Sequence, residues 1–427
     1  MMNNMLNHKT GNSRYSGNTG SGFTAGSPFW MLLACALLAG LILLLPGASV
    51  AEEARDLTAD CTYSWSKGST KRMDVLYDHD YEFFWKSNSA KNNYLEVRLP
   101  EGETCSGVQI KWAAINKKWC VEVQQNGEWV AVDGYSDDRA HLTTWTALDN
   151  VTEFRIASHS NYPHDLKICE LNVLSAGDRP AWIQDWEPTY EKADLMVVIA
   201  HPDDEYIFMG AVIPYYGAER GKRVLAVYIT ESSARRRTEL LDGLWTAGQR
   251  SYPLTGLFYD RYTMNLDEAY KKVGKKKVQT YMIQVFRHYK PEVVVTHDIH
   301  GEYGHGLHKL CADIVINALK KSGNSKYDKA SAKEYGLWDV PKCYIHLYPE
   351  NQIIFDWSMP LSAFGGRTAF DVADEAWHCH LSQQKSKYRV YVTGDDYDSQ
   401  IFGLYRSLVG PDREHTDFFE NLPDASE

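Results

Sequence analysis

Residues 195–205 read LMVVIAHPDDE, and this stretch decides the fold of the C-terminal part of the chain. Its first six residues are apolar without alternation, which is typical of a parallel strand that is buried on both faces. Polar groups follow at once, namely a histidine, two aspartates and a glutamate. Since open parallel sheets bind ligands at the carboxyl ends of their strands, the stretch predicts both a sheet and the place of a functional site.

Continuous apolar runs return twice downstream, as RVLAVYI at 223–229 and VVV at 293–295. Between them, apolar residues recur at helical spacing over 278–289, which predicts an amphipathic helix. Strands that alternate with helices are typical of a parallel sheet. We therefore expect an α/β, Rossmann-like domain over residues 185–427.

A second polar cluster, THDIHGEYGHGLH at 296–308, follows the third apolar run. Imidazoles and carboxylates at adjacent strand ends form a site of nitrogen and oxygen donors suited to zinc or a similar divalent metal. His305 and His308 are three residues apart, so they share one face if a helix begins near Gly304. The alternative, in which these side chains only cap helices and form surface pairs, is disfavoured because two such clusters coincide.

The two motifs together, AHPDDE at 200–205 and HDIHGEYGHGLH at 297–308, resemble the PIG-L/LmbE family of zinc-dependent N-acetylglucosamine deacetylases. The likeness extends over about residues 190–405, through the second strand ERGKRVLAVYIT, the pair Arg236 and Glu239, the pair Tyr344 and His346, and the segment HLSQ at 380–383. The chain departs from the family at YIFMG, 206–210, where the commoner version has small residues and a double glycine. That departure concerns the shape of the pocket, not its chemistry.

The resemblance implies a role for each motif residue. His201, Asp204 and His308 would bind the metal, Zn²⁺ or another divalent ion, with Asp203 as general base. His305 would polarise the carbonyl or protonate the leaving amine. The implied reaction removes the acetyl group from an N-acetylated amino sugar.

Four further residues are weaker candidates. Arg236 would contact substrate by resemblance, or else begin a solvated basic helix, and His380 would line the pocket or be an ordinary helix histidine. Asp298 and Glu302 would orient imidazoles or take part directly. Two other functions stay open, a catalytically inactive glycan-binding surface protein and a related metal amidase with a different substrate.

Residues 57–176 read as short alternating strands, at 94–99, 107–112, 120–124 and 153–158, with a turn at Asn126-Gly127. This pattern predicts an antiparallel all-β sandwich. The succession IKW, WCVEVQQNGEWVAV and KICELNVL resembles the discoidin, or F5/8 type C, family of galactose-binding-like sandwiches, which implies binding of glycans or a cell surface through loops. Trp112 and Trp129 are expected in the core, whereas Trp85 and Trp145 are candidate stacking surfaces for sugars.

The first 51 residues predict export. They contain only Lys9 and Arg14 as charged residues, and an apolar run at 29–46 precedes small residues at Ser49 and Ala51. We expect a signal peptide cleaved after Ala51, although about 17–18 apolar residues can also span a bilayer as an anchor. The protein is therefore expected to be secreted or held at the cell surface.

Cysteine content and charge agree with that expectation. Four cysteines of the first domain permit three pairings, of which we prefer Cys61–Cys169 with Cys105–Cys120. The formal net charge of the 427 residues is −11. Nucleic-acid binding requires a clustered basic face, so we expect no nucleic-acid partner.

Overall fold

The computed structural model describes residues 52–423, except 68, 89–91, 115–117, 134–140, 159–164, 232 and 257. Contacts group Glu52–Glu427 into one compact unit. The export segment predicted for residues 1–51 lies outside the described residues. Within the part that is described, no helix is long and apolar enough to cross a membrane.

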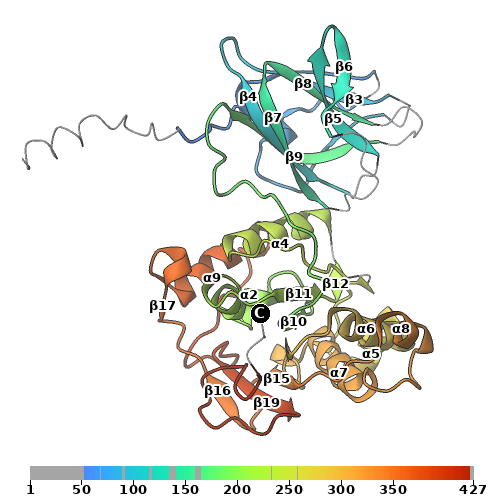
Figure 1. Cartoon of the computed structure of the whole chain (residues 1–427), viewed down its shortest axis with the longest axis vertical. Helices are drawn as coiled ribbons and strands as arrows, with labels where there is room; N and C mark the ends of the chain where they lie inside the picture. The colour runs from blue at the N-terminus through green and yellow to red at the C-terminus, as the bar shows by residue number, and fades with distance from the viewer. Residues whose placement is uncertain are drawn as a thin grey trace, which may run out of the picture. The chain divides into compact units, whose positions relative to one another are not determined.

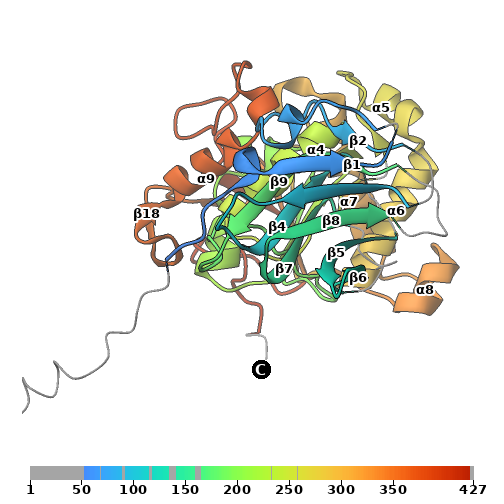
Figure 2. The same cartoon turned by 90° about the horizontal axis from the view of Figure 1, so that it is seen from above.

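Two antiparallel sheets make up the N-terminal part of this unit (Figures 1 and 2). One has the order β1-β3-β8-β5-β6, with bounds Thr62–Trp65, Tyr94–Arg98, Glu153–Ser158, Trp119–Gln125 and Glu128–Ala131. The other has the order β2-β9-β4-β7, with bounds Trp85–Lys86, Lys167–Ser175, Cys105–Trp112 and Thr143–Val151. The strands that alternation predicted are all present.

The core between these sheets is rich in tryptophan. The rings of Trp112 and Trp119 lie 4.6 Å apart between centroids, and Trp112 is fully buried, as predicted. Trp85 is fully buried as well, so the prediction that it offers a stacking surface is wrong. Trp145 is partly buried and lies over Gly107, where a Cβ atom would come within 2.2 Å of its ring.

The C-terminal part is built on a six-stranded sheet of order β11-β10-β14-β15-β19-β16. β10 (Leu195–Ile199), β11 (Val224–Tyr228), β14 (Val293–Thr296) and β15 (Lys342–His346) are parallel. β19 (Ile401–Ser407) and β16 (Gln352–Ile354) run antiparallel to their neighbours. The prediction of a parallel sheet is therefore confirmed for four strands, whereas the sequence did not predict the two antiparallel strands β19 and β16.

Helices bury both faces of this sheet. Figure 1 shows α5 (Leu266–Val273), α6 (Lys275–Tyr289), α7 (Gly306–Lys321) and α8 (Lys329–Tyr335) gathered apart from α4 (Ala234–Thr246) and α9 (Ala369–His378). Val198 and Val294 share a buried cluster with residues of α5, α6 and α7. Val197 and Val295 belong to the cluster on the other face, with residues of α4 and α9. Burial on both faces explains why these strands are apolar without alternation.

Several short helices and strands lie in the loops that connect the main elements of the C-terminal part. α2 (Asp204–Ile207) and α3 (Val212–Pro214) follow β10, and the small parallel pair β12 (Thr230–Glu231) and β13 (Phe258–Tyr259) follows β11. The hairpin β17 (Pro360–Leu361) and β18 (Arg367–Thr368) precedes α9. A capping box between Thr368 and Asp371 starts α9, which satisfies two backbone donors of its first turn.

The two preferred disulfides are not formed. The Cys105 thiol donates to the carbonyl oxygen of Gly107 at 3.3 Å, and the Cys169 thiol donates to that of Tyr81 at 3.9 Å. Cys61 lies in the core between the sheets, whereas Cys169 lies in a separate cluster that packs against Ala234. Cys61 and Cys169, the two ends of one predicted disulfide, thus face different layers. Burial raises the pKa of the Cys61, Cys105 and Cys169 thiols to about 12.

We expect that Lys342→Met destabilises the fold by about 3–5 kcal/mol, because it leaves a buried carboxylate without its cation. The Lys342 Nζ lies 2.6 Å from Oδ1 of Asp412, and both side chains are fully buried. Urea unfolding measures the effect. The control is Arg98→Met at the exposed pair with Glu153, which should cost under about 1 kcal/mol. Equal costs for the two variants would contradict the prediction.

Candidate metal centre and active site

Three side chains converge at the carboxyl end of β10 as a compact donor set. Nδ1 of His201 lies 3.0 Å from Oδ2 of Asp204, Nε2 of His308 lies 3.3 Å from Nδ1 of His201, and the distance from Nε2 of His308 to Oδ2 of Asp204 is 3.4 Å. Ligands about 2.0–2.1 Å from a tetrahedral metal are separated from one another by about 3.3 Å. The three atoms therefore have the spacing of metal ligands.

The charge of the site also fits a cation. Burial by itself lowers the pKa of His201, but Asp204 and Asp260 outweigh it and raise that pKa to about 10. Two carboxylates thus favour a positive charge beside this imidazole, where a metal ion would take the place of the proton. Two imidazole nitrogens and one carboxylate oxygen are donors that zinc accepts.

Glu302 holds the imidazoles in place. Its Oε2 lies 2.8 Å from Nδ1 of His297 and 2.7 Å from Nδ1 of His308, and its Oε1 lies 2.6 Å from Nδ1 of His346. All four side chains are fully buried. In spite of that burial, the facing imidazoles hold the pKa of Glu302 well below its ordinary value. A charged carboxylate on Nδ1 of His308 leaves Nε2 free to face a metal.

His297 lies beside the donor set, but neither of its ring nitrogens has a free lone pair with which to bind a metal. Its Nε2 accepts the backbone N–H of Ala200 at 3.0 Å, so the ring proton is on Nδ1, toward Glu302. His297, His308 and Asp204 also lie close enough to form a donor group. Because the His297 lone pair is already used, His201 is the better third ligand.

Asp203 lies beside the donor set in an unusual backbone conformation. Its φ is 127°, a region that a non-glycine residue adopts only under constraint. The Glu205 carboxylate accepts the Asp203 backbone N–H at 2.7 Å, and the Arg236 guanidinium lies 2.8 Å from Oδ1 of Asp203. Burial raises the pKa of the Asp203 carboxyl to about 7, against the opposing effect of Arg236.

His305 faces the same space from the start of α7. Its ring centroid is 4.8 Å from that of His201 and 5.2 Å from that of Tyr262. Burial lowers the pKa of His305 to about 3, and the neighbouring imidazoles add to the effect. The ring is therefore neutral near pH 7, and its Nδ1 accepts no hydrogen bond from the described residues.

These groups line a cavity of about 190 Å³. Tyr262 is 71% exposed and forms part of the rim. The lining residues come from the ends of several strands and from the loops beside them: His201, Asp203, Asp204, Ile207, Phe208, Arg236, Asp260, Tyr262, Tyr303, His305, Gln383 and Tyr388.

The structure separates the weaker sequence candidates. Arg236 reaches the cavity, whereas Arg235 pairs with Asp80, Glu82 and Glu239. His380 is not among the described side chains that line the cavity. Its Nε2 lies 3.0 Å from Oε1 of Glu205, whose other oxygen accepts the backbone N–H of Asp203.

The two acids after β14 also separate. The Asp298 carboxylate accepts the backbone N–H of His300, at 3.2 Å. Glu302, by contrast, contacts three imidazoles.

Sequence reasoning gave no role to Asp260. Its Oδ1 lies 3.5 Å from Nε2 of His201, so it orients that ring from the side opposite to Asp204. The residue follows β13, a strand of two residues that carries no recognisable pattern. His346 belongs to a strand that resembles the family, but the apolar residues of β15 around it do not indicate its contact with Glu302.

We expect Glu302→Gln to weaken zinc binding about 10–100-fold, because an amide cannot accept from three imidazole N–H groups as a carboxylate does. Competition with a chromophoric chelator measures the affinity, with circular dichroism as a check on folding. Asp298→Asn is the matched control and should leave the affinity unchanged. Equal weakening by both variants would assign the effect to the loop and not to the Glu302 contacts.

Comparison with known proteins agrees with this arrangement. The family model described as "PIG-L: GlcNAc-PI de-N-acetylase" matches residues 196–319. A 1D-myo-inositol 2-acetamido-2-deoxy-alpha-D-glucopyranoside deacetylase of Catenulispora acidiphila is 27% identical over 186 residues, which is 37% of this chain and 56% of that enzyme. The chain thus spans little more than half the length of this curated relative.

Solved structures match the two parts of the chain separately. The N,N'-diacetylchitobiose deacetylase of Pyrococcus horikoshii is 18% identical and covers 45% of this chain and 71% of its own, with a TM-score of 0.35. An F5/8 type C domain from Bacteroides fragilis is 18% identical and covers 30% of this chain and 97% of its own, with a TM-score of 0.23. The resemblance to the PIG-L family that the two motifs carry is confirmed by the family model, which matches residues 196–319.

Proposed function

We propose that this protein is an exported, zinc-dependent hydrolase that removes the acetyl group from an N-acetylated amino sugar. The observation that carries the proposal is the spacing of 3.0–3.4 Å among the donor atoms of His201, Asp204 and His308, directly beside a buried Asp203. The PIG-L family match and the deacetylases among the relatives support the same reaction class. The catalytic part would occupy residues 185–427 on a Rossmann-like sheet, after a sandwich at 57–176.

In this proposal His201, Asp204 and His308 hold the metal. A divalent metal bound there lowers the pKa of water toward about 7 and polarises an amide carbonyl. Asp203 accepts the proton of the attacking water, and its pKa of about 7 suits a base that works near neutral pH. The neutral ring of His305 donates its N–H to the oxyanion. The protonated Asp203 then returns the proton that it took from water to the leaving amine, which restores its carboxylate.

The remaining cavity residues fit a sugar that reaches in with one acetamido group. A volume of about 190 Å³ is below the range of about 300–1,000 Å³ that holds a whole drug-sized ligand. The rest of the substrate would lie along the exposed rim at Tyr262. Arg236 orients the Asp203 carboxylate through their 2.8 Å contact and can also bind a substrate hydroxyl.

We expect Asp203→Asn to keep the metal and to lose about 10²–10⁴-fold in kcat, because the amide cannot accept the proton of water. Acetate release from N-acetylglucosamine oligosaccharides measures the rate, and elemental analysis measures the zinc content. Glu101→Gln, at an exposed residue outside the site, is the control. Full activity of Asp203→Asn would remove this residue from the role of base.

The same assay separates the alternatives. An inactive glycan-binding protein would release no acetate from any glycan, with or without added zinc. An amidase with a different substrate would bind zinc normally and act only on other N-acylated compounds. Loss of activity on chelation, with recovery on adding zinc, is expected for the proposed enzyme.

We further propose that residues 1–51 direct export and are cleaved after Ala51. The apolar run at 29–46 and the small residues at Ser49 and Ala51 support this proposal. Mass spectrometry of the secreted protein should find an N-terminus at Glu52. A membrane-bound product that retains the apolar run would identify an uncleaved anchor instead.

A further inference from the structure

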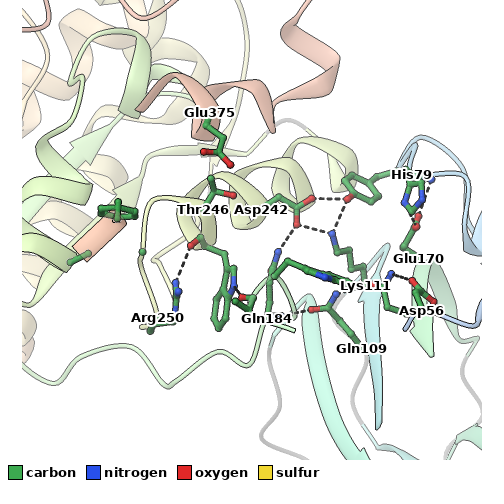
Figure 3. Close-up of a pocket in the computed structure, with 18 of the residues that line it drawn as sticks. Asp56, His79, Gln109, Lys111, Glu170, Gln184, Asp242, Thr246, Arg250 and Glu375 are labelled. Atoms are coloured by element: carbon green, nitrogen blue, oxygen red, sulfur yellow. Dashed lines mark hydrogen bonds and ion pairs between the residues drawn. The ribbon is translucent and has the colours of Figure 1, made fainter. Parts of the chain in front are cut away.

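A second cavity lies against the outer face of the sheet β2-β9-β4-β7 (Figure 3). On β4, Val108 and Ile110 point into the core, while Gln109 and Lys111 point to the other face. On β9, Glu170 and Asn172 share that outer face. An outer sheet face is ordinarily solvated, but these four polar side chains are only 1–7% exposed.

The cover over this face comes from α4. Oδ1 of Asp242 accepts from Nζ of Lys111 at 2.7 Å and from Nε2 of Gln184 at 2.6 Å, and Oδ2 accepts from the Tyr81 hydroxyl at 2.6 Å. Figure 3 shows these bonds as one network beside the cavity. Gln109 extends it by accepting the Gln184 backbone N–H at 2.6 Å. The network fixes one wall of the cavity in a defined geometry.

We call this second cavity, which lies beside the outer sheet face and α4, the interface cavity. Its volume is about 750 Å³, within the range of about 300–1,000 Å³ that is typical of ligand sites. Its lining includes the aromatic side chains of Trp182, Trp245 and Phe364. Trp182 is 48% exposed, and one face of Trp245 is covered by the Arg250 guanidinium at 4.0 Å from the ring centroid. Trp182 is therefore the indole that remains available to a ligand.

The cations of the cavity already have partners among the described residues. Lys111 is bound to Asp242, Arg367 pairs with Glu375, and Arg250 donates to two backbone carbonyl oxygens. Because Lys111 and Arg367 are paired with carboxylates, these two cations offer little to a phosphate or carboxylate ligand. The many polar groups equally disfavour a purely apolar ligand.

Glu170 supplies a buried polar atom without a hydrogen bond. Its side chain is 2% exposed, and Oε1 lies 2.8 Å from Nδ1 of His79 but makes no hydrogen bond to the described residues. Oε2 accepts the His79 backbone N–H at 3.2 Å. Burial raises the pKa of Glu170 to about 8, so near pH 7 this acid can exchange hydrogen bonds with a hydroxyl group.

We propose that the interface cavity binds a neutral oligosaccharide, as a carbohydrate site separate from the candidate active site. Trp182 stacks on a sugar ring, and Glu170 with the polar sheet face binds its hydroxyl groups. This combination of an exposed indole and uncharged hydrogen-bonding capacity is what a polyol with an apolar ring face requires. The two cavities share no lining residue.

Calorimetric titration of the full chain carrying Asp203→Asn, which prevents turnover, tests the proposal with a fixed panel: N-acetylchitotetraose, maltotetraose, lactose and the anionic sialyllactose. We expect at least one neutral sugar to bind, and Trp182→Ala to raise its Kd about tenfold, in line with the loss of one stacked aromatic contact. Glu170→Leu keeps most of the side-chain volume but removes both oxygens, and it should also weaken binding. Phe83→Ala, at a residue 49% exposed that does not line the cavity, is the matched control.

Two results would overturn the proposal: no neutral sugar of the panel binding in a Trp182-dependent manner, or sialyllactose binding as tightly as the neutral sugars. Thermal unfolding of each variant distinguishes lost binding from lost folding. Acetate release is measured separately in the chain with Asp203 intact. The binding result therefore tests the interface cavity even if the protein releases no acetate, and the acetate assay tests the deacetylase proposal even if no sugar binds to the interface cavity.

Discussion

The contact of one buried carboxylate with three imidazoles organises the catalytic end of this protein. Glu302 follows β14, and the rings it holds come from the end of β14, the first turn of α7 and the end of β15. A buried carboxylate is costly unless its oxygens are fully paired. The position of Glu302 therefore requires the three histidines to be where they are, and their positions in turn fix the direction of His308 toward His201 and Asp204.

Much of this arrangement could be predicted from the sequence, for a physical reason. Apolar runs such as LMVVI and VVV are distinctive because both faces of their strands are buried, and the motif residues follow the strand ends directly. His201, Asp204 and His308 are therefore close in space as soon as the parallel order is known. The period-two strands of the sandwich were equally readable, since one face of each strand packs into a core.

What could not be predicted depends on contacts between distant segments. Asp260 reaches the site from the segment after β13, which carries no motif, and the sequence around His346 does not reveal its contact with Glu302. The contact of His380 with Glu205 is equally invisible in the sequence. The antiparallel strands β16 and β19 are partly exposed and lack the continuous apolar pattern of their neighbours. Pairing of Cys61 with Cys169 failed because spacing along the chain does not reveal which layer each thiol faces.

The φ of 127° at Asp203 has a consequence for the evolution of such a site. Glycine adopts this conformation without strain, whereas any side chain there costs of order 1–3 kcal/mol. The backbone bond to Glu205 and the contact with Arg236 hold the strained residue in place. Mutation to glycine would relieve this backbone strain but would remove the carboxylate that pairs with Arg236 and serves the proposed reaction, so the strain is a cost that comes with having an acid at this position.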